Sequence, residues 1–139
     1  MPVSLTRTVT FHARHRYWVP AWTAEENRAQ FGWTSDEPGH GHAYQCAVTV
    51  VGTLNAVTGM VMDLPELDRI LAEEVLVLDG QHLNEQLPEF AYGATLPTCE
   101  SLAVWLFGRL APRLPGGVSL QRVRVAEDAT LHADCTGLS

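Results

Sequence analysis

The sequence of residues 40–54 is H-G-H-A-Y-Q-C-A-V-T-V-V-G-T-L. Its second half is rich in Val and Thr, which favour β-structure, and therefore predicts a strand. Residues two apart on a strand point to the same side, so the side chains of His40 and His42 would start about 7 Å apart and face one way. Two imidazoles at this spacing can bind one metal ion, and Gly41 between them leaves room for a ligand. The alternative is that both are loop histidines that bind no metal.

A third metal ligand must come from elsewhere in the chain. The remaining histidines are His12, His15, His82 and His132. His15 follows the Thr- and Val-rich stretch 4–11, which predicts a strand, and the end of one strand is where an antiparallel neighbour begins. Three nitrogen ligands with an open fourth position are typical of a catalytic zinc site.

The cysteines are not expected to join this site. Cys46 shares a strand face with His42 but lies about 13 Å further along it, too far to share the ion. No C-x-x-C pair occurs among Cys46, Cys99 and Cys135. Their spacing disfavours both a disulfide framework and a thiolate zinc site.

Capping signals and apolar spacing predict the helices. The caps are the capping boxes Thr23–Glu26 and Asp63–Glu66, and the single residue Thr98. They predict a short helix over 23–30 and two amphipathic helices over 64–78 and 97–110.

The remaining segments predict a sheet. Residues 59–64 and 118–127 are expected to be extended, a further strand is possible near the end, and residues 79–96 are expected to form a loop. The natural packing for this order is α+β, with two helices on one face of an antiparallel sheet. Uncovered strand edges would favour assembly between subunits.

Composition narrows the range of partners. A chain of 139 residues suits one domain, and its net charge is −7. The nine basic residues are all Arg and are scattered, so neither nucleic acid nor a membrane surface is an expected partner, whereas a small anionic ligand is compatible. No apolar run approaches the roughly 20 residues of a membrane span, and the N-terminus lacks the features of a signal peptide. A cytoplasmic location is expected.

Six blocks along the chain form a recognisable series. They are F-H-A-R-H-R-Y at 11–17, F-G-W-T-S-D-E-P-G-H-G-H-A-Y at 31–44, G-M-V-M-D-L at 59–64, L-D-G-Q-H-L-N at 78–84, P-T-C-E-S-L-A at 97–103 and R-V-A-E at 124–127. In this order they resemble the 6-pyruvoyl-tetrahydropterin synthases and their bacterial relatives, the 6-carboxy-tetrahydropterin synthases of queuosine biosynthesis.

The resemblance implies a fold and a site. The fold would be the tunnelling fold over residues 1–139, an antiparallel four-stranded sheet with two helices packed on one face. His15 would complete the zinc site with His40 and His42, and substrate binding would involve Glu127, which anchors the pterin ring, and Thr98. A hexamer of two trimers, with active sites at subunit interfaces, and the substrate 7,8-dihydroneopterin triphosphate are also implied.

Two positions depart from the family pattern. Thr34 occupies the place of the catalytic cysteine, and a hydroxyl is a far weaker acid than a thiol. Gly80 replaces the histidine of an Asp–His pair, which leaves Asp79 to orient a neighbour or to cap a loop.

Other side chains are candidates for the missing proton-transfer groups. They are Asp36 and Glu37 in the same loop, and His82, three residues after Asp79. His12 and His132 are further candidates for this role. The alternative for each is ordinary: the two acids are turn formers before Pro38, and His82 is a loop histidine.

Three functions are compatible with these residues. The first is a zinc-dependent lyase that acts on dihydroneopterin triphosphate or a related reduced pterin, by elimination or side-chain cleavage with an altered proton-transfer group. The second is a non-catalytic pterin-binding protein that keeps the zinc and the anchor. The third is an oligomeric scaffold with a vestigial metal.

Overall fold

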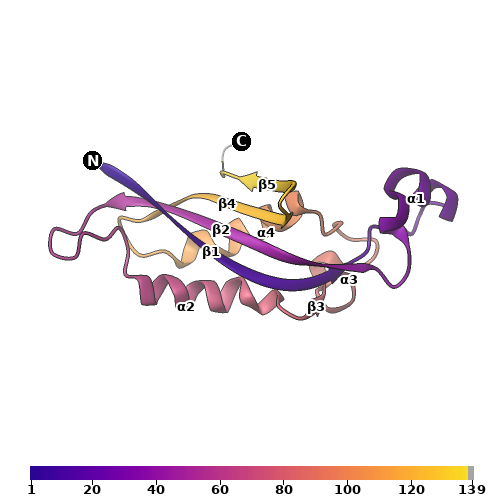
Figure 1. The fold of residues 1–139 in the computed structure, drawn as a ribbon, viewed down its shortest axis with the longest axis horizontal. Helices are drawn as coiled ribbons and strands as arrows, with labels where there is room; N and C mark the ends of the chain where they lie inside the picture. Colours follow the sequence, from indigo (N-terminus) through magenta and orange to yellow (C-terminus); the bar gives the residue numbers. More distant parts are fainter. Residues whose placement is uncertain (138–139) are drawn as a thin grey trace.

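The computed structural model describes residues 1–137, and five strands form its sheet. The strands are β1 (Pro2–His15), β2 (His40–Thr53), β3 (Gln81–His82), β4 (Ser119–Asp128) and β5 (Leu131–Cys135). Their order across the sheet is β3-β1-β2-β4-β5. Every neighbouring pair is antiparallel except β3 and β1, which are parallel (Figure 1).

The predicted α+β class is confirmed, but the prediction of four antiparallel strands is wrong. The sheet is mixed because the chain, after its second helix, returns beside β1 in the same direction. The returning strand has only two residues and lies within the predicted loop 79–96. A strand of two residues is too short to show the alternation that identifies strands in a sequence.

Three of the helices begin directly after the capping residues that the sequence predicted, Thr23, Asp63 and Thr98. The helices are α1 (Ala24–Phe31), α2 (Leu64–Glu74), α3 (Leu83–Gln86) and α4 (Cys99–Leu110), with 3₁₀ turns at Gly32–Ser35, Leu76–Leu78, Pro88–Phe90 and Ala111–Arg113. The Thr23 hydroxyl accepts a hydrogen bond from the Glu26 amide at 3.1 Å, and the Glu26 carboxylate accepts one from the Thr23 amide. Thr98 accepts from the Ser101 amide at 3.0 Å.

The segment 59–64, which was predicted to be extended, forms no strand. Residues 61 and 62 lie in a bend between β2 and α2, and Leu64 already belongs to α2. The Asn55 side chain accepts hydrogen bonds from the amides of Val57 and Thr58, and Gly59 has a positive φ of 69°. These local bonds turn the chain more strongly than the apolar residues favour extension.

The core lies between one face of the sheet and the helices α2 and α4, as Figure 1 shows. Along β1, buried Phe11, Ala13 and His15 alternate with exposed His12 and Arg14. Each fully buried large apolar side chain contributes roughly 1.5–3 kcal/mol relative to an exposed one. The alternation therefore fixes which side of β1 faces the core.

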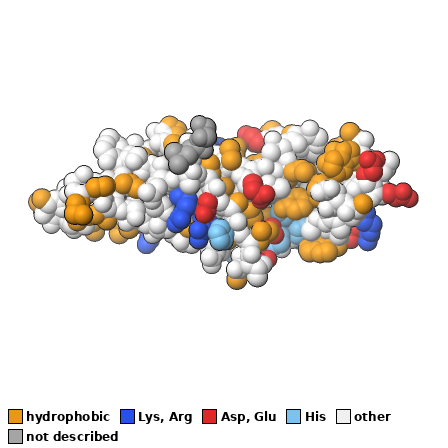
Figure 2. All heavy atoms as spheres, turned by 90° about the horizontal axis from the view of Figure 1, so that it is seen from above, with side chains coloured by type: hydrophobic (Ala, Val, Ile, Leu, Met, Phe, Trp, Pro, Cys, Tyr) orange, Lys and Arg blue, Asp and Glu red, His pale blue; other side chains and the backbone are white. Residues whose placement is uncertain are grey.

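The outer surface mixes charges of both signs. Figure 2 shows arginine and acidic side chains next to each other on one face, with apolar side chains among them. Arg124 and Asp134 form one such pair at 2.8 Å. Among the described helices, none is long and apolar enough to cross a membrane.

The turn before β2 depends on a glycine. Gly39 has a φ of 105°, and a Cβ at this position would lie 2.6 Å from the carbonyl oxygen of His15. Gly59 has a φ of 69°, but a Cβ there would meet no atom within 4 Å. Only Gly39 therefore combines an unfavourable backbone conformation with a close backbone contact.

We expect Gly39→Ala to lower the free energy of unfolding by about 2–4 kcal/mol, because strain and the clash with the backbone add. The matched variant Gly59→Ala should lose only about 1 kcal/mol, from strain alone. Urea denaturation of both variants measures the difference. Equal losses would show that the chain relaxes around Gly39 without cost.

Candidate metal centre

Three histidine side chains converge at one end of the β1–β2 pair. The register pairs His15 with His40 and Ala13 with His42, so all three imidazoles leave the same face of the sheet. One ring nitrogen from each lies within 4.8 Å of the others. The ring centroids are 4.6 Å apart for His15 and His40, 5.1 Å for His15 and His42, and 5.0 Å for His40 and His42.

The hydrogen bonds of His15 determine which of its nitrogens faces the others. Its Nδ1 lies 2.9 Å from the carbonyl oxygen of Pro97 and 2.9 Å from the Tyr44 hydroxyl. A carbonyl can only accept, so Nδ1 carries the proton and donates it. The lone pair of Nε2 then faces Nε2 of His40 at 2.9 Å. Fixing one ring nitrogen in this way is typical of metal-binding histidines.

The polar atoms around this point lack partners within the described chain. His40 Nδ1, His42 Nε2 and the Glu127 Oε2 oxygen are buried without a hydrogen bond. A tetrahedral zinc ion with nitrogen ligands at about 2.0–2.1 Å would separate its ligand nitrogens by about 3.3 Å. The Nε2 atoms of His15 and His40 lie 2.9 Å apart, which is close to this spacing. The three histidines therefore fit a zinc ion.

Burial keeps two of these imidazoles neutral. It lowers the pKa of His15 to about 3, against the opposing effect of the Pro97 hydrogen bond, and it lowers the pKa of His40 to about 4. A neutral imidazole is the form that binds a metal. The pocket therefore presents these ligands in the state that a metal requires.

Glu127 stands beside the histidines at the end of β4. Its Oε2 lies 3.5 Å from Nε2 of His42, and only 14% of its side chain is exposed. Burial raises the pKa of the Glu127 carboxyl, although nearby His42 opposes this shift. Thr98 caps α4, and its hydroxyl also lies 3.1 Å from Ser101 Oγ.

The loop before β2 carries three of the predicted proton-transfer residues. The Thr34 hydroxyl donates to the Phe31 carbonyl, and Asp36 is paired with Arg28 at 3.1 Å. Glu37 is 82% exposed and lies 3.5 Å from Arg16. The loop lies beside the metal centre, since the Trp33 ring is 4.7 Å from the ring of His40.

The other two predicted residues lie near β3. Asp79 accepts a hydrogen bond from the His12 amide at 2.7 Å, on the exposed edge of β1. His82 Nε2 donates to the Pro38 carbonyl at 2.8 Å. Among the described residues, the group that converges closely enough to hold a metal ion consists of His15, His40 and His42, without Asp79 or His82.

Two tyrosines of the site were missed by the sequence reasoning. Tyr44 is fully buried, contacts His15 and stacks on Phe11 at 4.9 Å, and Tyr17 lies 4.6 Å from the His15 ring. The period of two along β2 places residue 44 on the face of His40 and His42, so alternation is a signal that identifies Tyr44. No comparable signal identifies Tyr17, which follows the strand.

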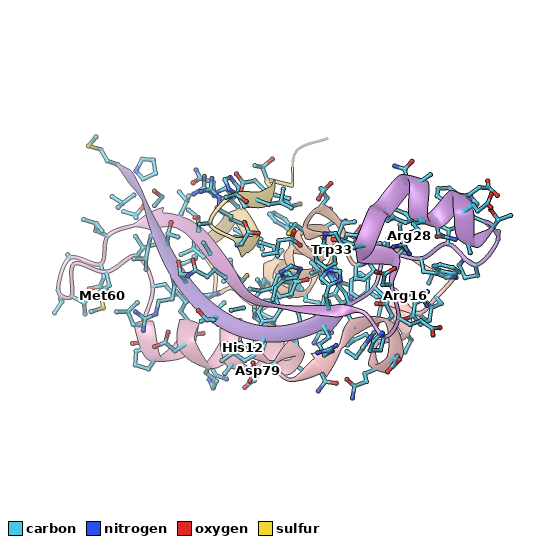
Figure 3. The ribbon with its side chains drawn as sticks, turned by 45° about the vertical axis from the view of Figure 1, so that its right-hand side comes forward. His12, Arg16, Arg28, Trp33, Met60 and Asp79 are labelled. Atoms are coloured by element: carbon cyan, nitrogen blue, oxygen red, sulfur yellow. The ribbon has the colours of Figure 1, made fainter. Side chains whose placement is uncertain are left out.

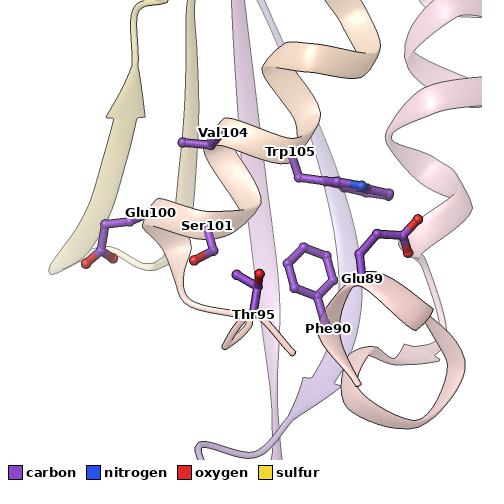
Figure 4. A pocket seen from close by; sticks show the side chains of 7 residues that line it. All are labelled: Glu89, Phe90, Thr95, Glu100, Ser101, Val104 and Trp105. Carbon is purple, nitrogen blue, oxygen red and sulfur yellow. The ribbon is translucent and has the colours of Figure 1, made fainter. Parts of the chain in front are cut away.

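A cavity of about 560 Å³ opens next to the start of α4 (Figure 4). Its lining residues are Glu89, Phe90, Thr95, Glu100, Ser101, Val104 and Trp105. Glu100 belongs both to this cavity and to the charges that raise the pKa of Glu127. Neither Glu127 nor any of the three histidines is among the described residues that line this cavity.

Comparison with known proteins places this geometry in a family. The family model described as 6-pyruvoyl tetrahydropterin synthase matches residues 4–137. The chain belongs to the 6-pyruvoyl tetrahydropterin synthase family. The predicted relationship is confirmed.

Individual relatives agree with this assignment. The human 6-pyruvoyl tetrahydrobiopterin synthase is 37% identical over 124 residues, which are 88% of this chain and 83% of the relative. A dihydroneopterin monophosphate aldolase from Pyrococcus furiosus is 33% identical over 88 residues, 63% of this chain and 69% of the relative. The solved structure of the Caenorhabditis elegans 6-pyruvoyl tetrahydropterin synthase has a TM-score of 0.90 at 26% identity, with 99% of this chain and 97% of the other covered.

The buried histidines should make the metal-free protein sensitive to acid. Because the pKa of His15 is about 3 in the folded chain and about 6.5 when unfolded, the unfolded state takes up the proton first as pH falls. His15 alone should cost about 2 kcal/mol between pH 8 and pH 5. Urea denaturation of chelator-treated protein at both pH values measures this loss.

The variant His15→Gln isolates the contribution of the His15 imidazole to this loss of stability. Its stability at pH 8 reports the cost of the substitution itself, and its loss between pH 8 and pH 5 should be smaller than that of the wild type by about 2 kcal/mol. Identical losses in the two proteins would contradict the assignment of a buried neutral imidazole to His15.

Proposed function

We propose that this chain is a zinc-dependent lyase acting on a reduced pterin, with His15, His40 and His42 as the metal ligands. The observation that carries the proposal is three converging imidazoles, two of which (His40 and His42) have a buried nitrogen without a hydrogen bond, beside the Glu127 Oε2 oxygen, which also has none. Buried polar groups without partners are costly, so a site that keeps several together indicates a ligand that satisfies them.

Glu127 is the proposed anchor for the pterin ring. An ionised carboxylate accepts two hydrogen bonds, and a pterin presents an amino group and a neighbouring ring N–H side by side. Thr98 caps α4 next to Cys99, whose thiol interacts with the backbone of Glu127, and Thr98 is proposed to help bind the substrate. Contact with the donors of the ring would stabilise the ionised form of Glu127 against the effect of burial.

Zinc, when bound, withdraws electron density from the substrate oxygens and so acidifies the adjacent C–H bond. The chain must supply groups that take this proton and return it. Within the loop before β2, the Thr34 hydroxyl donates to a carbonyl and Asp36 pairs with Arg28 at 3.1 Å. Glu37 contacts Arg16 only at the longer distance of 3.5 Å and is the more exposed of the loop's two acids, so we propose Glu37 as the group that replaces the cysteine. A solved structure of the Plasmodium vivax synthase is described as a catalytic-residue mutant with glutamate changed to cysteine, so glutamate serves in catalysis in that protein. Asp79, just before β3, and His82, in β3, are proposed to assist.

The substrate class follows from the relatives. Proposed substrates are 7,8-dihydroneopterin triphosphate and, by similarity to the Pyrococcus aldolase, dihydroneopterin monophosphate. The product decides between elimination and side-chain cleavage, and between a tetrahydropterin pathway and queuosine biosynthesis.

We further propose that residues 1–139 form one pterin-binding domain that assembles as a hexamer of two trimers. Exposed apolar side chains support assembly: Val3, Leu54, Val57 and Met60 are all exposed near the same end of the sheet.

A second candidate is a non-catalytic pterin-binding protein. It is supported by the intact metal and anchor positions together with the changed residues Thr34 and Gly80. It predicts that zinc and pterin bind without turnover.

Purified wild-type protein should contain about one zinc per chain, because three imidazoles bind this ion firmly. The variant His42→Ala should lose most of the zinc, while His132→Gln, which changes an exposed residue of β5, should retain it. Elemental analysis measures the metal, and mass spectrometry measures conversion of the triphosphate and the monophosphate. Conversion supports the lyase, and tight pterin binding without conversion supports the binding protein. Protein that neither converts nor retains a pterin would overturn both.

We expect Glu127→Gln to raise the Kd for a dihydropterin by at least about tenfold, since a charge-assisted pair of hydrogen bonds is lost. Zinc content should not change, because Glu127 is not among the three converging ligands. Fluorescence titration measures binding. The matched variant Glu85→Gln, at an exposed position of α3, should bind like the wild type. Unchanged affinity in Glu127→Gln would remove the anchor role.

A further inference from the structure

An aspartate and a histidine lie together on the exposed edge of β1. Asp79 Oδ1 accepts a hydrogen bond from the His12 amide at 2.7 Å and lies 3.6 Å from Nδ1 of the His12 ring. The Gly80 amide donates to the His12 carbonyl at 2.6 Å. Figure 3 shows His12 and Asp79 side by side along this edge, away from Trp33 and Arg16. Three contacts therefore hold residues 79–80 against residue 12.

The parallel strand pair explains this arrangement. Ala13 pairs with Gln81 and Arg14 with His82, so the same register continued by one residue places His12 beside Gly80. Both residues line one cavity of about 400 Å³. A Cβ at Gly80 would meet no atom within 4 Å. The cavity that His12 and Gly80 share is therefore open at the position where a side chain of residue 80 would begin.

We propose that His12, oriented by Asp79, is a proton-transfer residue that acts at the metal centre of a neighbouring copy of this chain. The inference rests on the proposed function. A histidine next to a carboxylate is a standard arrangement for general acid–base chemistry, because the carboxylate fixes the ring and stabilises its protonated form. Asp79 acts through His12 and is a positioning residue.

His12 and the metal centre of the same chain lie on opposite faces of β1, so His12 can act only at the metal centre of a second copy. His15, Phe11 and Ala13 face the core with the metal centre, whereas His12 is exposed on the other face, with 73% of its side chain accessible. Side chains on opposite faces of one strand point apart, so His12 cannot reach the three histidines of its own chain. Its exposed ring is available to another chain.

The proton balance is simple. A C–H bond of the substrate breaks, its proton passes to the neutral His12 imidazole, and the electron pair stays on the substrate. The imidazolium, whose Nδ1 lies 3.6 Å from the Asp79 carboxylate, returns its proton to the substrate or product at a later step. No oxidant or other co-reactant is needed.

Kinetics of His12→Gln test the role. With the pterin phosphate that the wild type converts, kcat should fall by about 100-fold or more, the usual contribution of a general acid or base. KM, zinc content and oligomer size should stay near the wild-type values. Added imidazole should restore part of the activity of His12→Ala, and His132→Gln should behave like the wild type. A kcat within about threefold of the wild type in His12→Gln would overturn the proposal, since a general base is worth far more.

Mixed oligomers test the action between chains. Chains with His12→Gln and chains with His42→Ala should each be inactive, and their mixture should regain activity, because some interfaces combine an intact His12 with an intact metal centre. No recovery in mixtures shown to contain both chains would overturn action on a neighbouring copy.

Paramagnetic NMR provides a readout that does not depend on turnover. Histidine-labelled chains carrying His42→Ala are mixed with unlabelled chains loaded with cobalt(II) in place of zinc. The His12 ring signals, assigned by their loss in His12→Gln, should be shifted and broadened by the partner's ion. Unaffected signals would overturn the proposal. Shifted signals in a protein that converts no pterin would instead place the failure in the proposed function.

Discussion

The antiparallel pairing of β1 with β2 is the constraint on which the rest of the structure depends. Fourteen residue pairs, from Pro2 with Thr53 to His15 with His40, form one uninterrupted register. It stacks Phe11 on Tyr44 and brings three imidazoles to a single point. A shift of one residue would turn every side chain of β1 to the other face and remove His15 from the site. The core and the metal centre are thus specified by the same hydrogen-bonded ladder.

The end of this ladder is held by polar groups in a buried setting. The Arg16 amide donates to the Asn84 side chain at 2.7 Å, Asn84 donates back to the Arg16 carbonyl at 3.0 Å, and the Arg16 guanidinium donates to the Ser35 carbonyl at 2.7 Å. These bonds connect β1 with α3 and with the turn before β2. Satisfied buried networks of this kind are rigid, which suits a site that must keep its ligands in place before a metal arrives.

The two faces of β1 carry different chemistry. The inner face carries the three converging imidazoles beside Glu127, whereas the outer face presents the His12–Asp79 pair to solvent. This division follows from the period of two along a strand, and under the proposed function it would place metal binding and proton transfer on opposite sides of a thin sheet. A protein built in this way gains from assembly, since a second copy can bring the outer face of one chain to the inner face of another.

The sequence by itself determined the helix caps at Thr23 and Thr98, the strand over residues 40–54 and the pairing of His40 with His42, because these features depend on contacts a few residues apart. It also determined the family, through six ordered motifs. Only the tertiary structure decided that β3 joins the sheet in parallel, that Tyr17 and Pro97 approach His15, and that Asp79 meets His12. Such contacts join segments up to 82 residues apart. Their geometry depends on strand register and on the path of the chain after α2, which no local pattern of side chains encodes.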